Sequence, residues 1–526
     1  KLQVDMDCEA GQGGSTSTAK LATQLPNPSP TTSSAISRST NPRNLRNLTG
    51  FQIDQSLLRG ISLRRSLRSC GKLWTRSPLD LPDAERAGLW AQSEEVKRLN
   101  TFLSHTWATP GWQKVLSLLV QSGGVHFLLG WLLGVLLGVA LDLGKVLPPL
   151  LSFPCGENLL CERGICVRVF GFLGSMAGFW GSPYIPQFHT DMCFLDVVSI
   201  NQADPELMGR GIYGLGGFLA VSSELRILWS RPYLTRLWCI FEMAAFRKAN
   251  PTGKIILKPL FLETFVVCAV FCLNIWLVID EIRMQVLFMG DASDMDQTSA
   301  MVQGTFNPLS FLSLIPVIWC FHQCRRLFRE KLEVVDNLKN FELAKVSCRT
   351  AEDREFIYHG IQMWYGSTEA FEEYVRGPLA TELTEPFSRT QFPFVYWMML
   401  MSPLVAVGLD NCLSFLSAEQ DSLAVLYFCI NSTFTACVVV LLCCRWALYL
   451  AERLASKAQA WQVDYGKTLV LWVLVVVPMA IARIALAHVS QGALTLVFFF
   501  FGLILCVLSF QSWPYELWRK CSKLSA

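Results

Sequence analysis

The chain has 526 residues and a formal net charge of +3; 52% of its residues are hydrophobic and only 17% are charged. So much apolar material with so little charge excludes an ordinary soluble globular protein. The basic residues lack the interleaved aromatic residues of a nucleic-acid surface, so no nucleic acid is expected as a partner. The apolar residues are clustered into runs about as long as a bilayer is thick, which predicts a multi-pass membrane protein with the lipid bilayer as its first partner.

Residues 1–98 are predicted to be a disordered and basic N-terminal region. Residues 1–60 are rich in Ser, Thr, Asn, Pro and Gly, and such a segment cannot bury enough apolar surface to offset its chain entropy. The chain starts at Lys1, so we expect a fragment or a processed form, and no signal peptide opens it. From Arg59 onward, basic residues stand next to leucines, and two interpretations stay open: a helix lying on anionic lipid, or a solvated linker.

Strands and helices alternate over residues 99–258, which predicts an α/β module with a parallel sheet and right-handed crossovers. Four strands are expected, at residues 101–105, 193–197, 225–229 and 254–257. A transmembrane hairpin at 125–184 is predicted to interrupt the module. Because a hairpin returns the chain close to where it left, this insertion need not break the sheet.

The rest of the chain is predicted to form a polytopic α-helical transmembrane bundle of about eight spans, paired into hairpins. The spans are placed at residues 125–141, 165–184, 260–279, 309–324, 392–409, 423–446, 468–487 and 493–510. The second and fourth are the weakest, since one contains Arg168 and the other Pro316, and a buried or re-entrant helix is the alternative for both.

The domain order after the module follows from these spans. One hairpin occupies 259–324, a cytosolic helical segment occupies 325–391, two hairpins occupy 392–512, and 513–526 form a tail. Connections inside the hairpins are poor in Lys and Arg, whereas the other side is rich in them. The positive-inside rule therefore places the α/β module, the helical segment and both termini in the cytosol, with the identity of the membrane left open.

Cysteines and glycines add two expectations about the first hairpin. Its loop on the far side of the membrane contains Cys155, Cys161 and Cys166, among which a disulfide is plausible. One face of the first span carries small residues at a spacing that lets helix backbones approach closely: Gly130, Gly134 and Gly138. We prefer packing against the glycine-rich second span to a dimer contact.

Several motifs of the module resemble the Toll/interleukin-1 receptor (TIR) domain. They are a Phe-Leu-Ser-His strand, a Phe-Leu-Asp strand, a Leu-Trp-Ser turn followed by Tyr233, and the run from Trp238 to Glu242, Trp-Cys-Ile-Phe-Glu, which is the most specific part. The resemblance implies a flavodoxin-like sheet and homotypic assembly with like modules, and some members of the family cleave NAD between nicotinamide and ribose. The loop at 207–212 lacks the family's usual Leu-x-x-Gly spacing, and no fifth strand and final helix precede the membrane. The helical segment 325–391 is a candidate substitute for them.

Glu242 is the predicted catalytic residue. It matches the glutamate that NAD-cleaving members of the family carry on the helix after the third strand. None of its neighbours three or four residues away is basic, and a carboxylate on such an apolar helix is costly unless it faces a polar cleft or a partner. Acids in such settings often have a raised pKa and serve catalysis, here by holding a ribose hydroxyl or stabilising an oxocarbenium-like transition state. A structural ion pair with Arg226 or Arg210 is the alternative.

Further residues are predicted to bind NAD, as a candidate substrate, at the carboxyl ends of the strands. They are Ser104, His105, Trp107, Asn201 and Trp238. Ser104 and Asn201 could contact ribose or phosphate, and a base could stack on Trp107, for which a place in the core is the alternative. No metal site and no resident cofactor are expected.

The leading hypothesis is a multi-pass membrane signalling protein whose TIR-like module assembles with like modules, with NAD hydrolysis as a candidate activity. A non-enzymatic adaptor of the same fold is the first alternative. The second is a transporter or channel with a non-catalytic regulatory TIR-like domain. Sparse intramembrane charge, with Arg483 as the best pathway candidate, argues against the second alternative.

Overall fold

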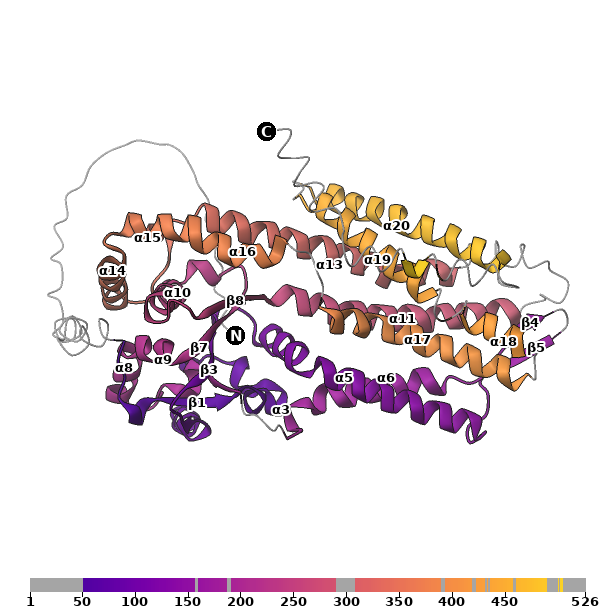
Figure 1. Cartoon of the computed structure of the whole chain (residues 1–526), viewed down its shortest axis with the longest axis horizontal. Helices are drawn as coiled ribbons and strands as arrows, with labels where there is room; N and C mark the ends of the chain where they lie inside the picture. The colour runs from indigo at the N-terminus through magenta and orange to yellow at the C-terminus, as the bar shows by residue number, and fades with distance from the viewer. Residues whose placement is uncertain are drawn as a thin grey trace, which may run out of the picture.

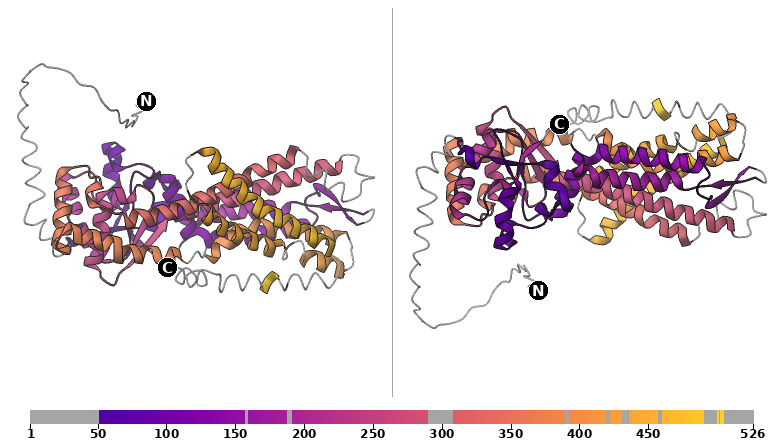
Figure 2. Two further views of the ribbon diagram at one scale, coloured as in Figure 1. Left: turned by 90° about the horizontal axis from the view of Figure 1, so that it is seen from above. Right: turned by 90° about the horizontal axis from the view of Figure 1, so that it is seen from below.

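The computed structural model of the chain describes residues 51–156, 159–186, 191–289, 308–388, 393–418, 422–430, 433, 436–456, 460–489, 500 and 502–504. The protein is elongated, with an α/β module at one end and a bundle of long helices at the other (Figure 1). Figure 2 shows the same division from above and from below. The two-stranded hairpin of β4 (Leu151–Gly156) and β5 (Leu159–Arg163) lies at the tip of the bundle that is farthest from the module.

The module contains a six-stranded mixed sheet in the order β2-β1-β6-β3-β7-β8. Its strands are β1 (Arg59–Ser62), β2 (Glu94–Glu95), β3 (Leu99–Ser104), β6 (Met192–Phe194), β7 (Ser222–Trp229) and β8 (Lys254–Pro259). The four strands expected from the sequence, β3, β6, β7 and β8, pair in parallel. β1 runs antiparallel to both of its neighbours, so the prediction of a purely parallel sheet is wrong at this edge.

The N-terminal region is ordered from residue 51 onward. It forms β1, α3 (Leu63–Thr75), α4 (Asp83–Leu89) and β2, so the prediction of a disordered region is wrong for residues 51–98. The reason is burial, because Ile61, Leu67 and Trp74 are at most 2% exposed. These apolar side chains pack on the sheet, and β1 hydrogen-bonds to the edge of β6. Residues 1–50 lie outside the described residues, so the prediction of disorder there stays a prediction.

A helical hairpin connects β3 to β6. It consists of α5 (Gly111–Leu143), the β4–β5 pair and α6 (Cys166–Gly181). α5 is one continuous helix of 33 residues that begins well before the span predicted at residues 125–141. The strands on either side of the insertion still pair, with Thr101 opposite Cys193 and Phe102 opposite Phe194. The insertion therefore leaves the sheet intact, as predicted.

Glycine faces bring α5 and α6 into backbone contact. A Cβ atom added at Gly130, Gly134 or Gly178 would lie well under 3.0 Å from a backbone carbonyl oxygen of the opposite helix. No side-chain rotation can relieve an overlap with backbone. The predicted intramolecular packing of these glycines is therefore confirmed.

The substitution Gly134→Val is expected to destabilise the protein by about 3 kcal/mol, because α5 and α6 would have to separate. Thermal unfolding of the full chain in detergent measures this effect. Leu133→Val is the matched control, since Leu133 is 68% exposed one position away on the same helix. Equal unfolding temperatures for the two variants would contradict the packing.

Side chains of the sheet alternate between two hydrophobic clusters, as expected for strands covered on both faces. Phe102 belongs to a cluster with α9 (Leu215–Ala220) and α10 (Leu237–Ala249), and Leu103 belongs to a cluster with α3 and α5. α8 (Pro205–Tyr213) precedes α9. The second cluster also contains Phe127 and Met399, so the core of the module continues into the helical bundle.

The helical segment 325–391 completes the module on the α10 side. It contains the second half of α13 (Pro308–Lys339), then α14 (Ala351–Tyr365), α15 (Thr368–Tyr374) and α16 (Ala380–Ser388). Leu338, Phe356 and Phe371 from this segment share the cluster of Phe102 and α10. The segment therefore packs against the α10 side of the module and shares its core.

Four helices in the described part of the chain are long and apolar enough to cross a membrane. They are α5 itself, Leu260–Arg283 of α11 (Leu260–Met289), α17 (Phe394–Ser417) and Trp461–Met479 of α20 (Trp461–Val489). The second predicted span corresponds to α6, which has only 16 residues. The other helical pieces are α18 (Ser422–Cys429) and α19 (Ala436–Arg453). A bundle of eight spans is not shown, and most of the eighth predicted span lies outside the described residues.

Candidate active site at the carboxyl ends of the parallel strands

Three chain segments meet at the carboxyl edge of the sheet. β3 ends at Ser104, β6 is followed by α7 (Asp196–Ser199), and β7 is followed by η5 (Tyr233–Thr235) and α10, which carries Glu242. β3 lies between β6 and β7, so the chain crosses to the other side of β3 after β6. In open α/β sheets, ligands bind at the point where the strand order reverses in this way.

Glu242 is held by a short relay of hydroxyl groups. The Ser104 hydroxyl donates to Oε2 of Glu242, and the Ser104 oxygen lies 2.5 Å from the phenol oxygen of Tyr233. Ser104 and Tyr233 are fully buried, whereas Glu242 is only partly buried. Within the described residues nothing forms an ion pair with Glu242, and its one side-chain hydrogen bond reaches Oε2. The second oxygen, Oε1, accepts no hydrogen bond from this part of the chain.

The environment of Glu242 favours its protonated form. Burial raises the pKa of the carboxyl to about 8. The hydrogen bond from Ser104 acts in the opposite direction, and the negative charge of Asp196 adds to the rise. At neutral pH most molecules therefore carry a neutral Glu242. A cationic ligand placed beside it would favour the charged form.

Asp196 forms the second acidic group at this edge. Its Oδ2 accepts a hydrogen bond of 2.7 Å from the indole N–H of Trp107, and its Oδ1 lies 3.9 Å from Nε2 of His105. Burial, together with the charge of Lys114, lowers the pKa of His105 to about 4, although Asp196 opposes this shift. His105 is therefore neutral at pH 7, and its buried Nε2 has no hydrogen-bond partner among the described residues.

Lys114 packs against Trp107 beneath these residues. Its side chain is fully buried, and Nζ lies 4.3 Å from the centroid of the Trp107 ring and 3.3 Å from the carbonyl oxygen of Thr106. The imidazole of His105 meets the same ring edge-on at 4.9 Å. Lys114 and His105 therefore contact the Trp107 ring, and Asp196 binds its N–H. These contacts leave less of the ring free for stacking with a base.

The structure brings together some of the predicted residues and gives the others structural contacts. His105 and Trp107 contact Asp196, and Ser104 contacts Glu242, whose pKa is raised by the charge of Asp196. Two others are engaged elsewhere. Asn201 caps a turn, where Oδ1 accepts from two backbone N–H groups at 2.9 Å. Trp238 donates its N–H to Asp353 on α14 at 3.3 Å and packs against Phe356. The ligand-binding roles of Asn201 and Trp238 stay predictions.

The ion-pair alternative for Glu242 is wrong for both of the arginines considered. Arg226 pairs with Glu224 at 2.5 Å, and Arg210 pairs with Asp54. Conversely, sequence reasoning did not assign Asp196, Tyr233 or Lys114 to the site. A signal existed for two of them, since Asp196 ends an apolar strand and Tyr233 follows the turn after the third strand.

Comparisons with protein-family models, with curated proteins and with solved structures find no match to this chain. Among the described residues, no group of three or more His, Cys, Asp or Glu side chains is placed to hold a metal ion. The function is therefore inferred from the geometry of the residues at the sheet edge.

Proposed function

We propose that the chain is a multi-pass membrane signalling protein whose flavodoxin-like, TIR-like module hydrolyses NAD. The observation that carries this proposal is Glu242: a partly exposed carboxyl with a raised pKa, oriented by Ser104 at the ligand edge of the sheet. The four parallel strands lie side by side in the order β6-β3-β7-β8. Numbered by their order along the chain, this is 2-1-3-4. This agrees with the start of the flavodoxin-like order and supports the TIR-like assignment.

In the proposed reaction, the bond between C1′ of the ribose and the nicotinamide nitrogen breaks, and its electron pair goes to the nicotinamide ring. Before cleavage, the positive charge of that ring favours the ionised form of Glu242, whose proton passes to bulk water. The carboxylate then faces the ribosyl cation that develops at C1′ and stabilises it. Water adds to C1′ and gives its proton to Glu242, which returns to its neutral form. Ser104 positions the carboxylate throughout by its hydrogen bond.

The test is nicotinamide release from NAD by the full chain reconstituted in liposomes, because the membrane hairpin cannot be cut from the module without breaking the chain between β3 and β6. We expect release that increases when the protein is clustered at high surface density, since TIR-like modules are proposed to act by self-association. No release at any density would remove the enzymatic part and leave a non-enzymatic adaptor.

We propose a topology with the module, the helical segment 325–391 and both termini in the cytosol, and with a bundle of about eight spans. Cys161 in the β4–β5 hairpin is disulfide-bonded, whereas Cys193 and Cys239 in the module are free thiols. Disulfides persist on the oxidising side of a membrane and thiols on the reducing side. The hairpin and the module lie at opposite ends of the protein, which supports this orientation (Figure 1).

Labelling of single introduced cysteines by an impermeant maleimide tests this topology. Glu355→Cys on α14 is expected to react only after the cell membrane is opened, and Leu147→Cys, after α5, is expected to react in intact cells. Both positions are exposed, so access is decided by the membrane and not by the fold. The same labelling pattern at both positions would overturn the orientation.

The transporter alternative finds little support in the bundle. Arg168 lies 3.5 Å from Glu281 and 3.9 Å from Asp410, and Arg163 also pairs with Glu281. Asp410 accepts two further hydrogen bonds from the first backbone N–H groups of α6. These charged side chains pair with one another between helices and do not form a row along an ion or substrate pathway. The side chain of Arg483 lies outside the described residues.

A further inference from the structure

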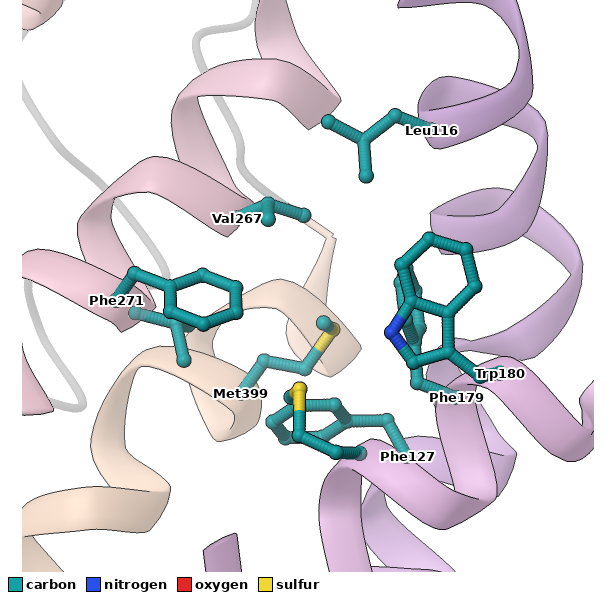
Figure 3. A pocket seen from close by; sticks show the side chains of 9 residues that line it. Leu116, Phe127, Phe179, Trp180, Val267, Phe271 and Met399 are labelled. Atoms are coloured by element: carbon teal, nitrogen blue, oxygen red, sulfur yellow. The ribbon is translucent and has the colours of Figure 1, made fainter. Parts of the chain in front are cut away.

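A cavity of about 130 Å³ lies among α5, α6, α11 and α17, and its lining is apolar apart from the indole nitrogen of Trp180. Figure 3 shows Leu116, Phe127, Trp180, Phe271 and Met399 arranged around it. An engineered apolar cavity of roughly 150 Å³ stays dry and takes up benzene, so a cavity of this size and lining suits a hydrocarbon and not water. The ligand that the cavity can take is therefore apolar.

The cavity opens toward the outer surface of the bundle. Trp180 and Phe271 line it, yet they are 48% and 40% exposed, whereas Phe127 on the inner side is 3% exposed. Trp180 belongs to α6 and Phe271 to α11, so the opening lies between these two helices. In a membrane this surface faces lipid. The hydrocarbon closest at hand is an acyl chain of the bilayer.

Basic residues lie one turn away, at the end of α6. Tyr184 in η4 (Ser182–Tyr184) follows Trp180 by four residues, which is about 6 Å of helix rise. The guanidinium of Arg68 lies 5.6 Å from the Tyr184 ring centroid and donates to the carbonyl oxygen of Pro183 at 3.1 Å. The buried Arg64 donates to the carbonyl oxygen of Ser182 at 3.1 Å. These contacts fix α3 against the module-side end of α6.

α3 presents a positive surface at this level. It contains no acidic residue. Arg65, Arg68 and Lys72 are exposed, and among them Arg65 is paired with Glu94 at 2.8 Å. Aromatic residues such as Trp180 and Tyr184 are typical of the boundary between hydrocarbon and headgroups. Arg68 lies at a kink of α3, where Arg68 to Gly71 leave the helical conformation, and Lys72 follows it. An exposed basic segment at that boundary complements a negatively charged headgroup.

We propose that the cavity and α3 together bind one anionic phospholipid from the leaflet on the module side. An acyl chain enters the cavity between Trp180 and Phe271, and the phosphate headgroup contacts Arg68 and Lys72. Leu67 of α3 and Phe127 of the cavity share one hydrophobic cluster with Leu103 and Leu228 of the sheet. Binding therefore stabilises the module as well as the bundle.

The experiment uses the full chain, delipidated in a neutral detergent. Phosphatidylglycerol or phosphatidylcholine with identical acyl chains is added, and the unfolding temperature and the number of retained lipids are measured, the latter by native mass spectrometry. We expect phosphatidylglycerol to raise the unfolding temperature and to be retained as one molecule per chain. Phosphatidylcholine should bind more weakly, and glycerol 3-phosphate, which has the headgroup chemistry without acyl chains, should have no effect.

Two pairs of variants separate the acyl and headgroup contacts. Val267→Phe fills the cavity and should abolish retention, whereas Leu133→Phe, at an exposed position of α5, should not. The double variant Arg68→Gln, Lys72→Gln should raise the half-saturating concentration of phosphatidylglycerol roughly 25-fold, because each basic residue near an anionic lipid surface contributes about fivefold. Lys345→Gln with Arg349→Gln, two exposed cations of the segment 325–391, is the matched control.

Three results would overturn the proposal. Equal retention of the two phospholipids would mean ordinary boundary lipid without a headgroup site. Normal retention by Val267→Phe would remove the cavity as the acyl site. If that variant does not fold, the wild-type protein still tests the proposal. Glycerol 3-phosphate that raises the unfolding temperature as much as phosphatidylglycerol would show that the acyl chain plays no part.

Discussion

Glu242→Gln is expected to abolish NAD cleavage, with a loss of at least about 10³-fold, or roughly 4 kcal/mol of transition-state stabilisation. Glutamine has the shape of glutamate and can still accept the hydrogen bond from Ser104, but it cannot carry the negative charge that faces the ribosyl cation. Nicotinamide release by the full chain in liposomes measures the effect. Glu355→Gln, which removes an exposed carboxylate on α14, is the control and should keep full activity. Activity that survives in Glu242→Gln would assign the chemistry to another residue.

The same substitution should change how stability depends on pH. The pKa of Glu242 in the folded protein is about 8, above its ordinary value of 4.5, so its contribution to stability is complete below pH 4.5 and is lost as pH rises through 8. His105 behaves in the opposite way. Its pKa of about 4 lies below the ordinary 6.5, so its contribution is complete above pH 6.5 and is lost as pH falls through 4.

Between pH 4.5 and 6.5 these two dependences oppose each other, and above pH 6.5 only that of Glu242 remains. The wild-type unfolding temperature should therefore fall between pH 6.5 and 8 relative to that of Glu242→Gln, in which this loss is absent. Parallel curves for the two proteins over this range would mean that Glu242 ionises as an ordinary exposed glutamate.

The strands that the sequence revealed each contain a run of apolar residues. β3, β7 and β8 overlap the ranges where strands were expected. β1 was missed because it is only four residues long and includes Arg59, and its strand geometry comes from pairing with β6, about 130 residues later. Such a pairing leaves no local pattern in the sequence.

Hydropathy located the long helices that are apolar enough to cross a membrane, but not their ends. α5 continues from the module into the bundle without a break, because Trp112 to Gln121 and the apolar run after them are both compatible with one helix. α13 likewise joins the span predicted at residues 309–324 to the predicted helical segment 325–391. The boundary between water and lipid changes which residues are favourable on a helix, but it does not end the helix.

The candidate site could be foreseen only in part. The sequence placed Ser104 and Glu242 at the same sheet edge, yet the hydrogen bond between them joins residues 138 positions apart. It could not show that Arg210 and Arg226 already have other carboxylate partners, or that Trp238 faces α14. These are properties of side-chain packing, whereas the parallel pairing of the strands follows from the alternation of strands and helices.

A second large effect is expected far from the sheet, at Asp464. Its carboxylate pairs with the fully buried Arg325 at 2.9 Å and with Arg329 at 2.6 Å, both on α13. Arg325 also donates to the carbonyl oxygen of Leu454 and to the hydroxyl of Thr468. Asp464→Asn would leave buried positive charge without its counter-ion, which costs about 3–5 kcal/mol. Asp336→Asn, which removes an exposed carboxylate on α13, is the control.

The consequence should extend to the module because α13 runs from the Asp464 contact to the module core, where Val334 and Leu338 are buried. We therefore expect Asp464→Asn to lower the unfolding temperature and also to expose the segment 325–391 to limited proteolysis. Replacing both partners with apolar residues, Arg325→Met with Asp464→Leu, should recover most of the stability, because no charge then stays buried. If the double variant is as unstable as Asp464→Asn, the pair stabilises the protein by its hydrogen-bond geometry and not by balancing charge. If Asp464→Asn shows the wild-type proteolysis pattern, the stability of the module does not depend on this contact in the bundle.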